Sequence, residues 1–391
     1  MGEGGRAWAV LETDVGVWMD DTFALQALLE GVGGLRLAAA VASCGGSSQV
    51  LMKHLRRAGW GGVPVGEGPK CPGLLPSALS GWGADENPDE YPGGYSRNGS
   101  QLLAETIHSV QEREGPEAPP VIVLVLGPPS ATAEMLRIYP DIAAKVRVVS
   151  MMGSLRPNVQ MPWGSLTPIA EYNVRLDVPA TRSLLSASWT EPVAIAEVGS
   201  TIQLRFDGAD YQRLRRGAAE NPTGGAALFM EQYEHWVQTC RANETMRCHA
   251  EADRIHPAQQ TPVMFDVGAL ALAENFPGMM ISQKNLTISD RGILGVSTNG
   301  SGSPVQIASD WSSGEDVEAF KAAVIDSLVP PPRHNGWVTL EIELILLIVL
   351  ILASILGGFG WFYYYKRHAR KRYVRFDDAF QPPSDEEDQI K

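Results

Sequence analysis

The stretch Ala7–Leu29, AWAVLETDVGVWMDDTFALQALL, decides the fold, because an apolar run, a cluster of carboxylates and a helical pattern follow one another directly. The apolar run over 7–11 is typical of a buried strand, and apolar residues recur at helical spacing from Phe23 to Leu28. Asp20 and Asp21 stand just before that pattern, where carboxylates cap a helix. The stretch therefore predicts a strand, an acidic loop and a helix.

Carboxylates are dense between the predicted strand and helix, at Glu12, Asp14, Asp20 and Asp21. They converge at the carboxyl end of the strand, where they repel one another unless a cation lies among them. A set of oxygen ligands favours calcium or magnesium over zinc. The alternative is ordinary helix capping beside a solvated acidic loop. The spacing by itself leaves both interpretations open.

Strand-like and helix-like segments alternate along the chain that follows. The predicted strands cover 35–42, 63–65, 121–126 and 146–152, and the predicted helices cover 49–58, 100–112 and 131–138. This alternation predicts an α/β fold with a mostly parallel central sheet and helices on both faces. In such a fold, ligands bind at the carboxyl ends of the strands.

Composition narrows the classes of function. The chain has 391 residues, 44% of them hydrophobic, which suits one large domain. Its formal net charge is −13, so no basic surplus is left for binding nucleic acid. Of the cysteines, Cys240 and Cys248 are close enough in sequence to close a small disulfide loop.

An uncharged apolar run, LILLIVLILASILGGFGWFYYY, covers 344–365 and is long enough to cross a bilayer as a helix, although a buried core helix is the alternative. Basic residues follow it directly, which by the positive-inside rule places the carboxyl end in the cytosol. The sequence thus predicts a single-pass membrane glycoprotein whose large domain is extracellular or lumenal. Glycosylation sequons precede the run, at Asn98, Asn243, Asn285 and Asn299. The predicted parts are an α/β domain over 1–329, a juxtamembrane spacer over 330–343, a transmembrane helix over 344–365 and a cytosolic tail over 366–391.

Further motifs stand at predicted strand ends or helix starts. They are Leu126-Gly-Pro-Pro-Ser130, Thr167-Pro-Ile-Ala-Glu171-Tyr-Asn173 and Met264-Phe265-Asp266. Together with the acidic stretch, they resemble, in the same order, the motifs of the inosine-uridine preferring nucleoside hydrolases. That family's first strand ends in Asp-x-Asp-x-Gly-x-Asp-Asp; here Glu12 replaces the first Asp, and two more residues precede Asp20. The resemblance covers about 7–328 and implies a nucleoside hydrolase-like fold.

The resemblance also implies a metal site and a ribose site. Calcium would be held by Asp14, Asp21, Asp266 and the main-chain oxygen of Ser130, and Asp14 would take a proton from a metal-bound water. The ribose hydroxyls would be bound by Asp20, Glu171 and Asn173. A carboxylate accepts from two hydroxyls and an amide both donates and accepts, which explains these residue types.

For the base, the resemblance points to aromatic residues. Phe265 stands where many members have a histidine that serves the leaving base. Some purine-preferring relatives have an aromatic residue there and hold the base between two rings. Trp82, in the long loop over 71–99, is the candidate for the second ring, and packing of Trp82 against its own loop is the alternative.

The leading hypothesis is therefore a membrane-anchored enzyme that hydrolyses the N-glycosidic bond of ribonucleosides, with a leaning toward purines, to free base and ribose. The rival hypothesis is a catalytically impaired, membrane-displayed nucleoside-binding protein, motivated by Glu12, the lengthened acidic loop and the lost histidine. The expected partners are a small nucleoside and, through the carboxyl-terminal helix, a membrane. A homo-oligomer is left open.

Overall fold

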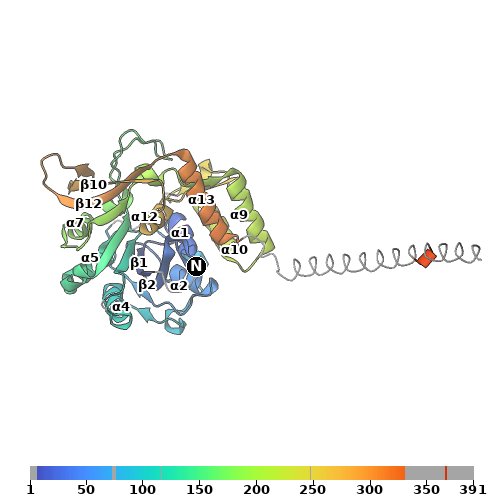
Figure 1. The fold of residues 1–391 in the computed structure, drawn as a ribbon, viewed down its shortest axis with the longest axis horizontal. Coiled ribbons are helices and arrows are strands. Elements are labelled where there is room, and N and C mark those ends of the chain that lie inside the picture. The colour runs from blue at the N-terminus through green and yellow to red at the C-terminus, as the bar shows by residue number, and fades with distance from the viewer. Residues whose placement is uncertain (1–6, 73–75, 116, 247, 331–365, 368–391) are drawn as a thin grey trace, which may run out of the picture. The chain divides into compact units, whose positions relative to one another are not determined.

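The computed structural model describes residues 7–72, 76–115, 117–246, 248–330 and 366–367. The chain divides into two compact units, Met1–Pro330 and Pro331–Lys391. The fold lies within the first unit and is shown in Figure 1.

The strands follow the apolar segments of the sequence. They are β1 (Ala7–Thr13), β2 (Leu35–Ala42), β3 (Val65–Glu67), β4 (Tyr95–Ser96), β5 (Val121–Val125), β6 (Val146–Met151), β7 (Val193–Ala196), β8 (Arg205–Asp207), β9 (Gln260–Val263), β10 (Met279–Ile288), β11 (Leu294–Val296) and β12 (Ser303–Trp311).

The helices fill most of the chain between them. They are α1 (Asp20–Leu29), α2 (Ser48–Arg57), α3 (Ser80–Gly83), α4 (Gly99–Glu114), α5 (Ser130–Ile138), α6 (Tyr172–Leu176), α7 (Val178–Ser186), α8 (Val198–Thr201), α9 (Gly208–Glu220), α10 (Gly225–Ala242), α11 (His249–Arg254), α12 (Val267–Glu274) and α13 (Gly314–Leu328), with 3-10 turns at Val32–Gly34, Pro88–Glu90 and Pro140–Ala144.

The large sheet has the strand order β11-β10-β12-β7-β6-β5-β1-β2-β3-β4. Pairing is parallel from β12 to β4, and β10 is antiparallel to both β11 and β12. A separate antiparallel pair joins β8 and β9. The predicted α/β fold with a mostly parallel central sheet is thus confirmed, with an antiparallel edge that the sequence did not predict.

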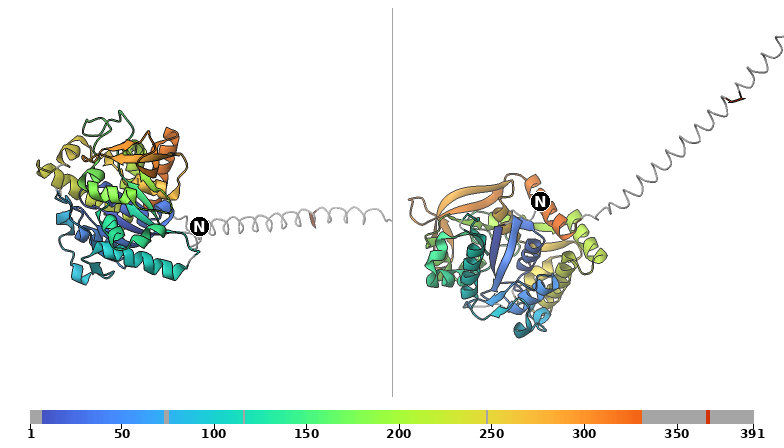
Figure 2. Two further views of the ribbon diagram at one scale, coloured as in Figure 1. Left: turned by 90° about the vertical axis from the view of Figure 1, so that its left-hand side faces the viewer. Right: turned by 60° about the horizontal axis from the view of Figure 1, so that its bottom comes forward.

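Side chains of the central strands alternate between the two faces of the sheet. In β5, Ile122 and Leu124 pack in an apolar cluster with α1, α2 and α12, whereas Val121, Val123 and Val125 pack in a second cluster with α4, α5 and α7. Because successive side chains of a strand point to opposite faces, a continuous run of apolar residues needs helices on both sides. Figure 2 shows the sheet between these helices.

The first predicted elements lie where the sequence placed them, with one difference in their detail. The first strand extends to Thr13, and α1 starts at Asp20. The residue before that helix is Met19, and no side chain caps the helix start by a hydrogen bond. Asp20 and Asp21 lie in the first turn instead of serving as the predicted cap, so their carboxylates remain available to a neighbouring site.

No helix within the described residues is long and apolar enough to cross a membrane. The longest described helix, α10, carries Glu231, Glu234 and Arg241, charges that would be costly in hydrocarbon. On this finding we correct the predicted localisation as a single-pass membrane protein with an extracellular or lumenal domain and a cytosolic tail. The run over 344–365, on which that prediction depended, lies outside the described residues.

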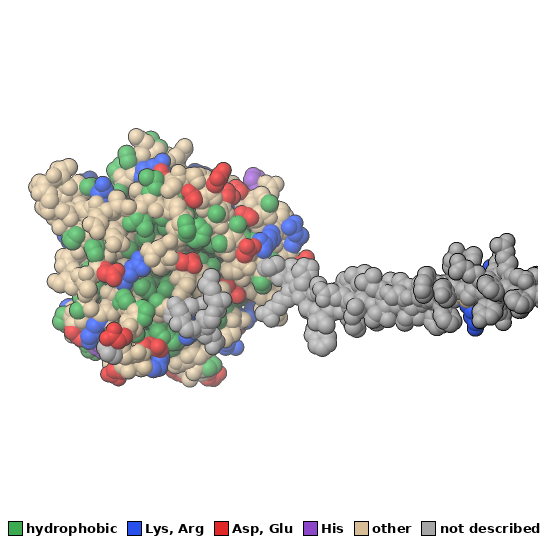
Figure 3. Space-filling view, in the orientation of Figure 1, with side chains coloured by type: hydrophobic (Ala, Val, Ile, Leu, Met, Phe, Trp, Pro, Cys, Tyr) green, Lys and Arg blue, Asp and Glu red, His purple; other side chains and the backbone are tan. Residues whose placement is uncertain are grey.

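Charges of both signs share the surface of the described domain. In the view of Figure 3, acidic and basic side chains are interspersed among hydrophobic and other residues. Several oppositely charged residues pair on the surface, as Arg182 does with Asp290 and Arg213 with Asp326. Exposed pairs of this kind stabilise a fold by less than about 1 kcal/mol each.

Candidate active site

A cavity of about 410 Å³ opens where the parallel strands end. It lies next to the carboxyl ends of β1, β5, β6 and β7, strands of the same large sheet. Residues of α10 and α11 also line it. Polar and charged residues of its lining are Asp14, Asp20, Asp21, Glu171, Tyr172, Asn173, Arg175, Glu251 and Asp266, and aromatic ones include Trp18, Trp163, Trp236 and Phe265. This position is where α/β sheets bind ligands.

Four aspartates from three segments meet in the cavity. Asp14 follows β1, Asp20 and Asp21 begin α1, and Asp266 precedes α12. One carboxylate oxygen each from Asp20, Asp21 and Asp266 lies within 4.8 Å of the others. All but the half-buried Asp20 are buried. The structure thus brings together the aspartates that the sequence predicts as site residues.

Burial and mutual repulsion make this cluster unfavourable as free carboxylates. Burial raises the pKa of Asp14, Asp20 and Asp266 well above its usual range, and the charges of the neighbouring aspartates raise it further. The pKa of Asp21 is raised to about 6, again by burial, although a hydrogen bond from Thr13 opposes the shift. Asp14 Oδ2 is buried and accepts no hydrogen bond from a described residue. A hard cation would satisfy these oxygens and remove the repulsion.

Two glycines let neighbouring loops close around Asp14. A Cβ atom at Gly46 would lie 2.8 Å from Asp14 Cα, and one at Gly127 would lie 2.8 Å from Asp14 Oδ1. Real Cβ atoms do not approach other atoms so closely, so larger residues would push the aspartate aside. The Leu-Gly-Pro motif after β5 therefore supplies close backbone approach as well as a turn.

The lengthened acidic loop keeps its carboxylates in the cavity. The extra residues of the loop include Trp18, which lines the cavity, and its ring centroid is 6.4 Å from that of Trp236 on α10. Trp236 Nε1 also donates to the carbonyl of Val17 at 3.4 Å. Contacts with α10 thus hold the loop in place. The added residues contribute the ring of Trp18 to the cavity lining.

Glu171 and Asn173 are held at the cavity by backbone groups. Glu171 precedes α6 and accepts hydrogen bonds from the amides of Gly153, Asn173 and Val174 at 2.9–3.3 Å. Burial raises the pKa of Glu171, and these bonds oppose that shift. Asn173 Nδ2 donates to the carbonyls of Leu126 and Met151 at 2.7 and 3.0 Å. These bonds orient the Asn173 amide, so that its oxygen is the atom that can accept a hydrogen bond from a ligand hydroxyl.

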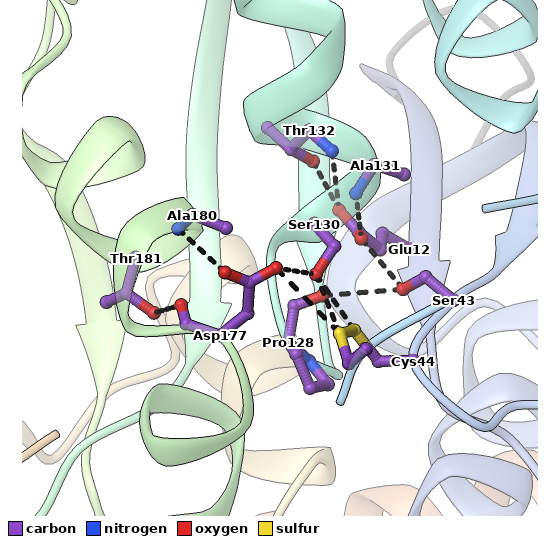
Figure 4. Close-up of a disulfide and its surroundings, with 11 residues drawn as sticks. Glu12, Ser43, Cys44, Pro128, Ser130, Ala131, Thr132, Asp177, Ala180 and Thr181 are labelled. Atoms are coloured by element: carbon purple, nitrogen blue, oxygen red, sulfur yellow. Dashed lines mark hydrogen bonds between the residues drawn. A yellow bond between two sulfur atoms is a disulfide. The ribbon is translucent and has the colours of Figure 1, made fainter. Parts of the chain in front are cut away.

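Glu12, which the sequence grouped with the acidic cluster, lies outside the cavity lining. Figure 4 shows its carboxylate at the start of α5, where it accepts from Ser43 Oγ, the amides of Ala131 and Thr132, and Thr132 Oγ1, at 2.6–2.8 Å. Burial raises its pKa, and these hydrogen bonds oppose the shift. The longer side chain that replaces the family's aspartate thus joins β1 to the first turn of α5.

Replacing Glu12 by Gln is expected to lower the free energy of unfolding by about 1–3 kcal/mol, because an amide N–H would face the Thr132 N–H and leave a buried donor without an acceptor. Denaturant unfolding measures the change. The exposed Glu220→Gln is the matched control. Equal stability of the Glu12 variant and the control would contradict this role.

The hydroxyl of Ser130 has its contacts outside the cavity lining. Its hydroxyl donates to Asp177 Oδ2 at 2.6 Å and lies against the Cys44–Cys71 disulfide, as Figure 4 shows. Ser130 is not among the cavity-lining residues; Leu126, at the start of the same motif, is. The predicted metal ligand is the main-chain oxygen of Ser130, the first residue of α5, and that role stays a prediction because these contacts involve only the hydroxyl.

Trp82 is also outside the cavity lining. It lies buried on α3, where Nε1 donates to Glu231 Oε1 at 2.8 Å and Lys53 Nζ sits 4.8 Å from the ring centroid. These contacts correspond to packing against neighbouring elements, and in this structure Trp82 does not share the cavity lining with Phe265. Phe265 does line the cavity.

Several residues line the cavity although no motif of the sequence predicts that they belong to the site. Trp18, Trp163 and Trp236 supply aromatic surface that had been assigned to Trp82, and Glu251 supplies an acid from α11. Trp236 stands at a helical position that is typical of a core residue. Only its contacts in the folded protein therefore show that it lines the cavity. The predicted Cys240–Cys248 disulfide is confirmed, with S–S 2.04 Å, and it joins the end of α10 to the start of α11.

Solved structures with this fold include nucleoside hydrolases. A plant nucleoside hydrolase matches with a TM-score of 0.63 and 16% identity, covering 84% of this chain and 100% of that chain. A purine-preferring ribonucleoside hydrolase from Gardnerella vaginalis matches with a TM-score of 0.61 and 17% identity, covering 83% of this chain and 100% of that chain. At such identities, the likeness shows the fold alone.

Comparison of sequences identifies the family. A pyrimidine-specific ribonucleoside hydrolase from Salmonella arizonae is 30% identical over 122 residues, which cover 31% of this chain and 34% of that protein. The chain thus matches about a third of the length of that curated relative. The family model described as inosine-uridine preferring nucleoside hydrolase matches residues 9–325, which include every candidate residue of the cavity. The chain belongs to the inosine-uridine preferring nucleoside hydrolase family.

Proposed function

We propose that the protein hydrolyses the N-glycosidic bond of ribonucleosides, with a preference for purines, to give free base and ribose. The observation that carries this proposal is the meeting of four aspartates, Glu171 and Asn173 in one cavity at the strand ends. The carboxylates and the amide of this cavity can accept hydrogen bonds from sugar hydroxyls, and one carboxylate can take a proton from water. Family membership supports the same reaction class.

The donor set fits a calcium ion. Asp14, Asp21 and Asp266 are buried, carry only oxygen ligands, and have raised pKa values caused by burial and by one another. Calcium accepts six to eight oxygens, so water and substrate hydroxyls would complete its coordination. When bound, calcium would supply positive charge that makes a nearby water more acidic.

The protein's own residues would then position the substrate and move a proton. Asp20, Glu171 and the Asn173 oxygen hold the ribose hydroxyls, which fixes the anomeric carbon in the cavity. Asp14 takes a proton from the water that attacks this carbon as the bond to the base breaks. The negative charges around the sugar stabilise the positive charge that develops on it.

Aromatic side chains support the preference for purines. Trp18, Trp163, Trp236 and Phe265 line the same cavity as the carboxylates. Stacking on an aromatic ring stabilises a base by about 1–3 kcal/mol and grows with the stacked area, so the larger purine ring gains more. The relatives named above are described as purine-preferring and as pyrimidine-specific, which makes base preference a question for measurement.

Purified protein is expected to release free base from a panel of ribonucleosides, fastest from purine ribonucleosides, and to slow at least about a hundredfold after calcium is chelated, because loss of the charge leaves several kcal/mol of stabilisation missing. Chromatography of the released bases measures both effects. Restoring calcium should restore the rate. Base release that is unchanged by chelation would contradict the calcium site, and absence of base release from every nucleoside would contradict the activity.

A further inference from the structure

Glu251 is an acidic residue of the cavity to which the proposed function gives no role. The other acidic residues in the described lining come from the strand ends, α1 and the segment before α6, whereas Glu251 comes from α11. It is half-buried, and its charge lies close enough to Asp20 to raise the pKa of that aspartate. Glu251 thus faces the same cavity from a different element.

The helix that carries Glu251 is firmly positioned over the cavity. The Cys240–Cys248 disulfide joins it to α10, and the Arg241 guanidinium donates to the carbonyls of Ala252 and Ile255 at 2.9–3.1 Å. A flexible surface helix would not hold an acid in register with a substrate. These constraints make α11 suitable for presenting a reactive side chain.

Glu251 is also grouped with the aromatic part of the lining. Its chain neighbour Ala250 lines the cavity, as does Trp236 on the attached α10. Arg254, on the same helix, donates to the carbonyl of Pro162 at 2.8 Å, next to Trp163. The helix of Glu251 is thus joined to α10, which carries Trp236, and to the segment next to Trp163, so Glu251 and aromatic surface that suits a flat base belong to one cavity.

A side-chain acid in the cavity accelerates the reaction when it protonates the leaving base. When the bond from C1′ to the base nitrogen breaks, its electron pair stays on the base, and an anionic base leaves poorly unless a proton reaches it. Phe265 has no proton to give. A positioned general acid accelerates such a step by about 10²–10⁴-fold.

We infer that Glu251 is the general acid that protonates the departing base, an assignment that rests on the proposed ribohydrolase function. The C1′–N bond breaks and its electrons pass to the base, while the Glu251 carboxyl gives its proton to a ring nitrogen. The attacking water adds its oxygen to C1′ and loses a proton to Asp14. Neutral base and ribose result, Glu251 regains a proton from solvent, and Asp14 releases one.

The electrostatic surroundings of Glu251 agree with this role. Burial raises the pKa of Glu251 to about 7, and the charges of Arg205 on β8 and Arg254 on its own helix oppose the shift. Asp20 on α1 and Tyr233 on α10 also face it. An acid with a pKa near neutrality is partly protonated at neutral pH and can both give and regain a proton.

Two substrates that differ in their leaving group test the inference on the purified full chain. Glu251→Gln is expected to lower kcat for a purine ribonucleoside at least about a hundredfold but to leave kcat for 4-nitrophenyl riboside within about threefold of the parent, because nitrophenolate leaves without a proton. The parent's kcat on the nucleoside should fall as pH rises above about 7, and the variant should lack that fall. Asp253→Asn, an exposed carboxylate on the same helix, is the matched control and should match the parent on both substrates.

The nitrophenyl substrate also shows that the variant is folded. An equal loss on both substrates, or no loss on the nucleoside, overturns the role of Glu251 while the ribohydrolase function stands. A parent that splits neither substrate overturns the ribohydrolase function and the inference with it.

Discussion

Replacing Asp14 by Asn is expected to lower kcat for nucleosides about 10³-fold or more while nucleoside affinity stays within about tenfold of the parent. The comparison is made at saturating calcium, which offsets the loss of one charged ligand. Asn keeps the shape and one oxygen but cannot accept a proton from water. Asp20, Glu171 and Asn173 still line the cavity in the variant, so the ribose contacts persist. The loss therefore falls on the transition state and not on binding. Steady-state kinetics combined with calorimetric binding separates the two effects.

The same experiment decides between an enzyme and a binding protein. Asp290→Asn, whose carboxylate is 94% exposed and lies outside the described cavity lining, controls for the change of charge and should behave as the parent. If the parent binds nucleosides and never releases free base, the non-catalytic hypothesis holds. The lengthened acidic loop would then be its physical cause, because a displacement of about 1 Å can cost a hundredfold in rate.

Replacing Asp21 or Asp266 by Asn is expected to weaken calcium binding by about a hundredfold or more and, at neutral pH, to raise the melting temperature of the calcium-free protein by about 2 °C. Each change removes one charged ligand, which explains the loss of affinity. Each also removes one charge from a buried cluster in which the pKa values of the aspartates are raised by burial and repulsion. Calorimetry measures the affinity, and thermal unfolding in the presence of a chelator measures the stability.

Calcium affinity should fall while the melting temperature of the calcium-free protein rises, and this combination is specific to a charged metal site. A carboxylate that only supports the fold should destabilise the calcium-free protein when it is neutralised. Asp290→Asn again provides the control, since it should change neither quantity. Parent-like calcium affinity in both variants would place the metal site elsewhere, and a lower melting temperature would contradict repulsion among the aspartates.

The sequence alone determined the fold class and most of the carboxylates of the cavity. Alternating faces and apolar runs predicted β1, β2, β5 and β6, because strand formation there depends on short-range patterns. Asp14 directly follows a strand of the parallel sheet, so its position at the ligand-binding edge could be predicted from the strand pattern. Glu171 precedes α6 and Asp266 follows β9 of the separate antiparallel pair, so only the order of the motifs predicted that they join Asp14 in one cavity.

The tertiary structure alone decided which other side chains reach the cavity. Trp82 and Trp236 both occur in segments with aromatic and acidic neighbours, yet Trp82 packs against Lys53 and Glu231 while Trp236 lines the cavity. Glu251 belongs to a short helix whose place depends on a disulfide and on hydrogen bonds from Arg241. Such positions result from packing between segments distant in sequence, and no local pattern of residues encodes the direction in which one side chain of a helix or loop will point.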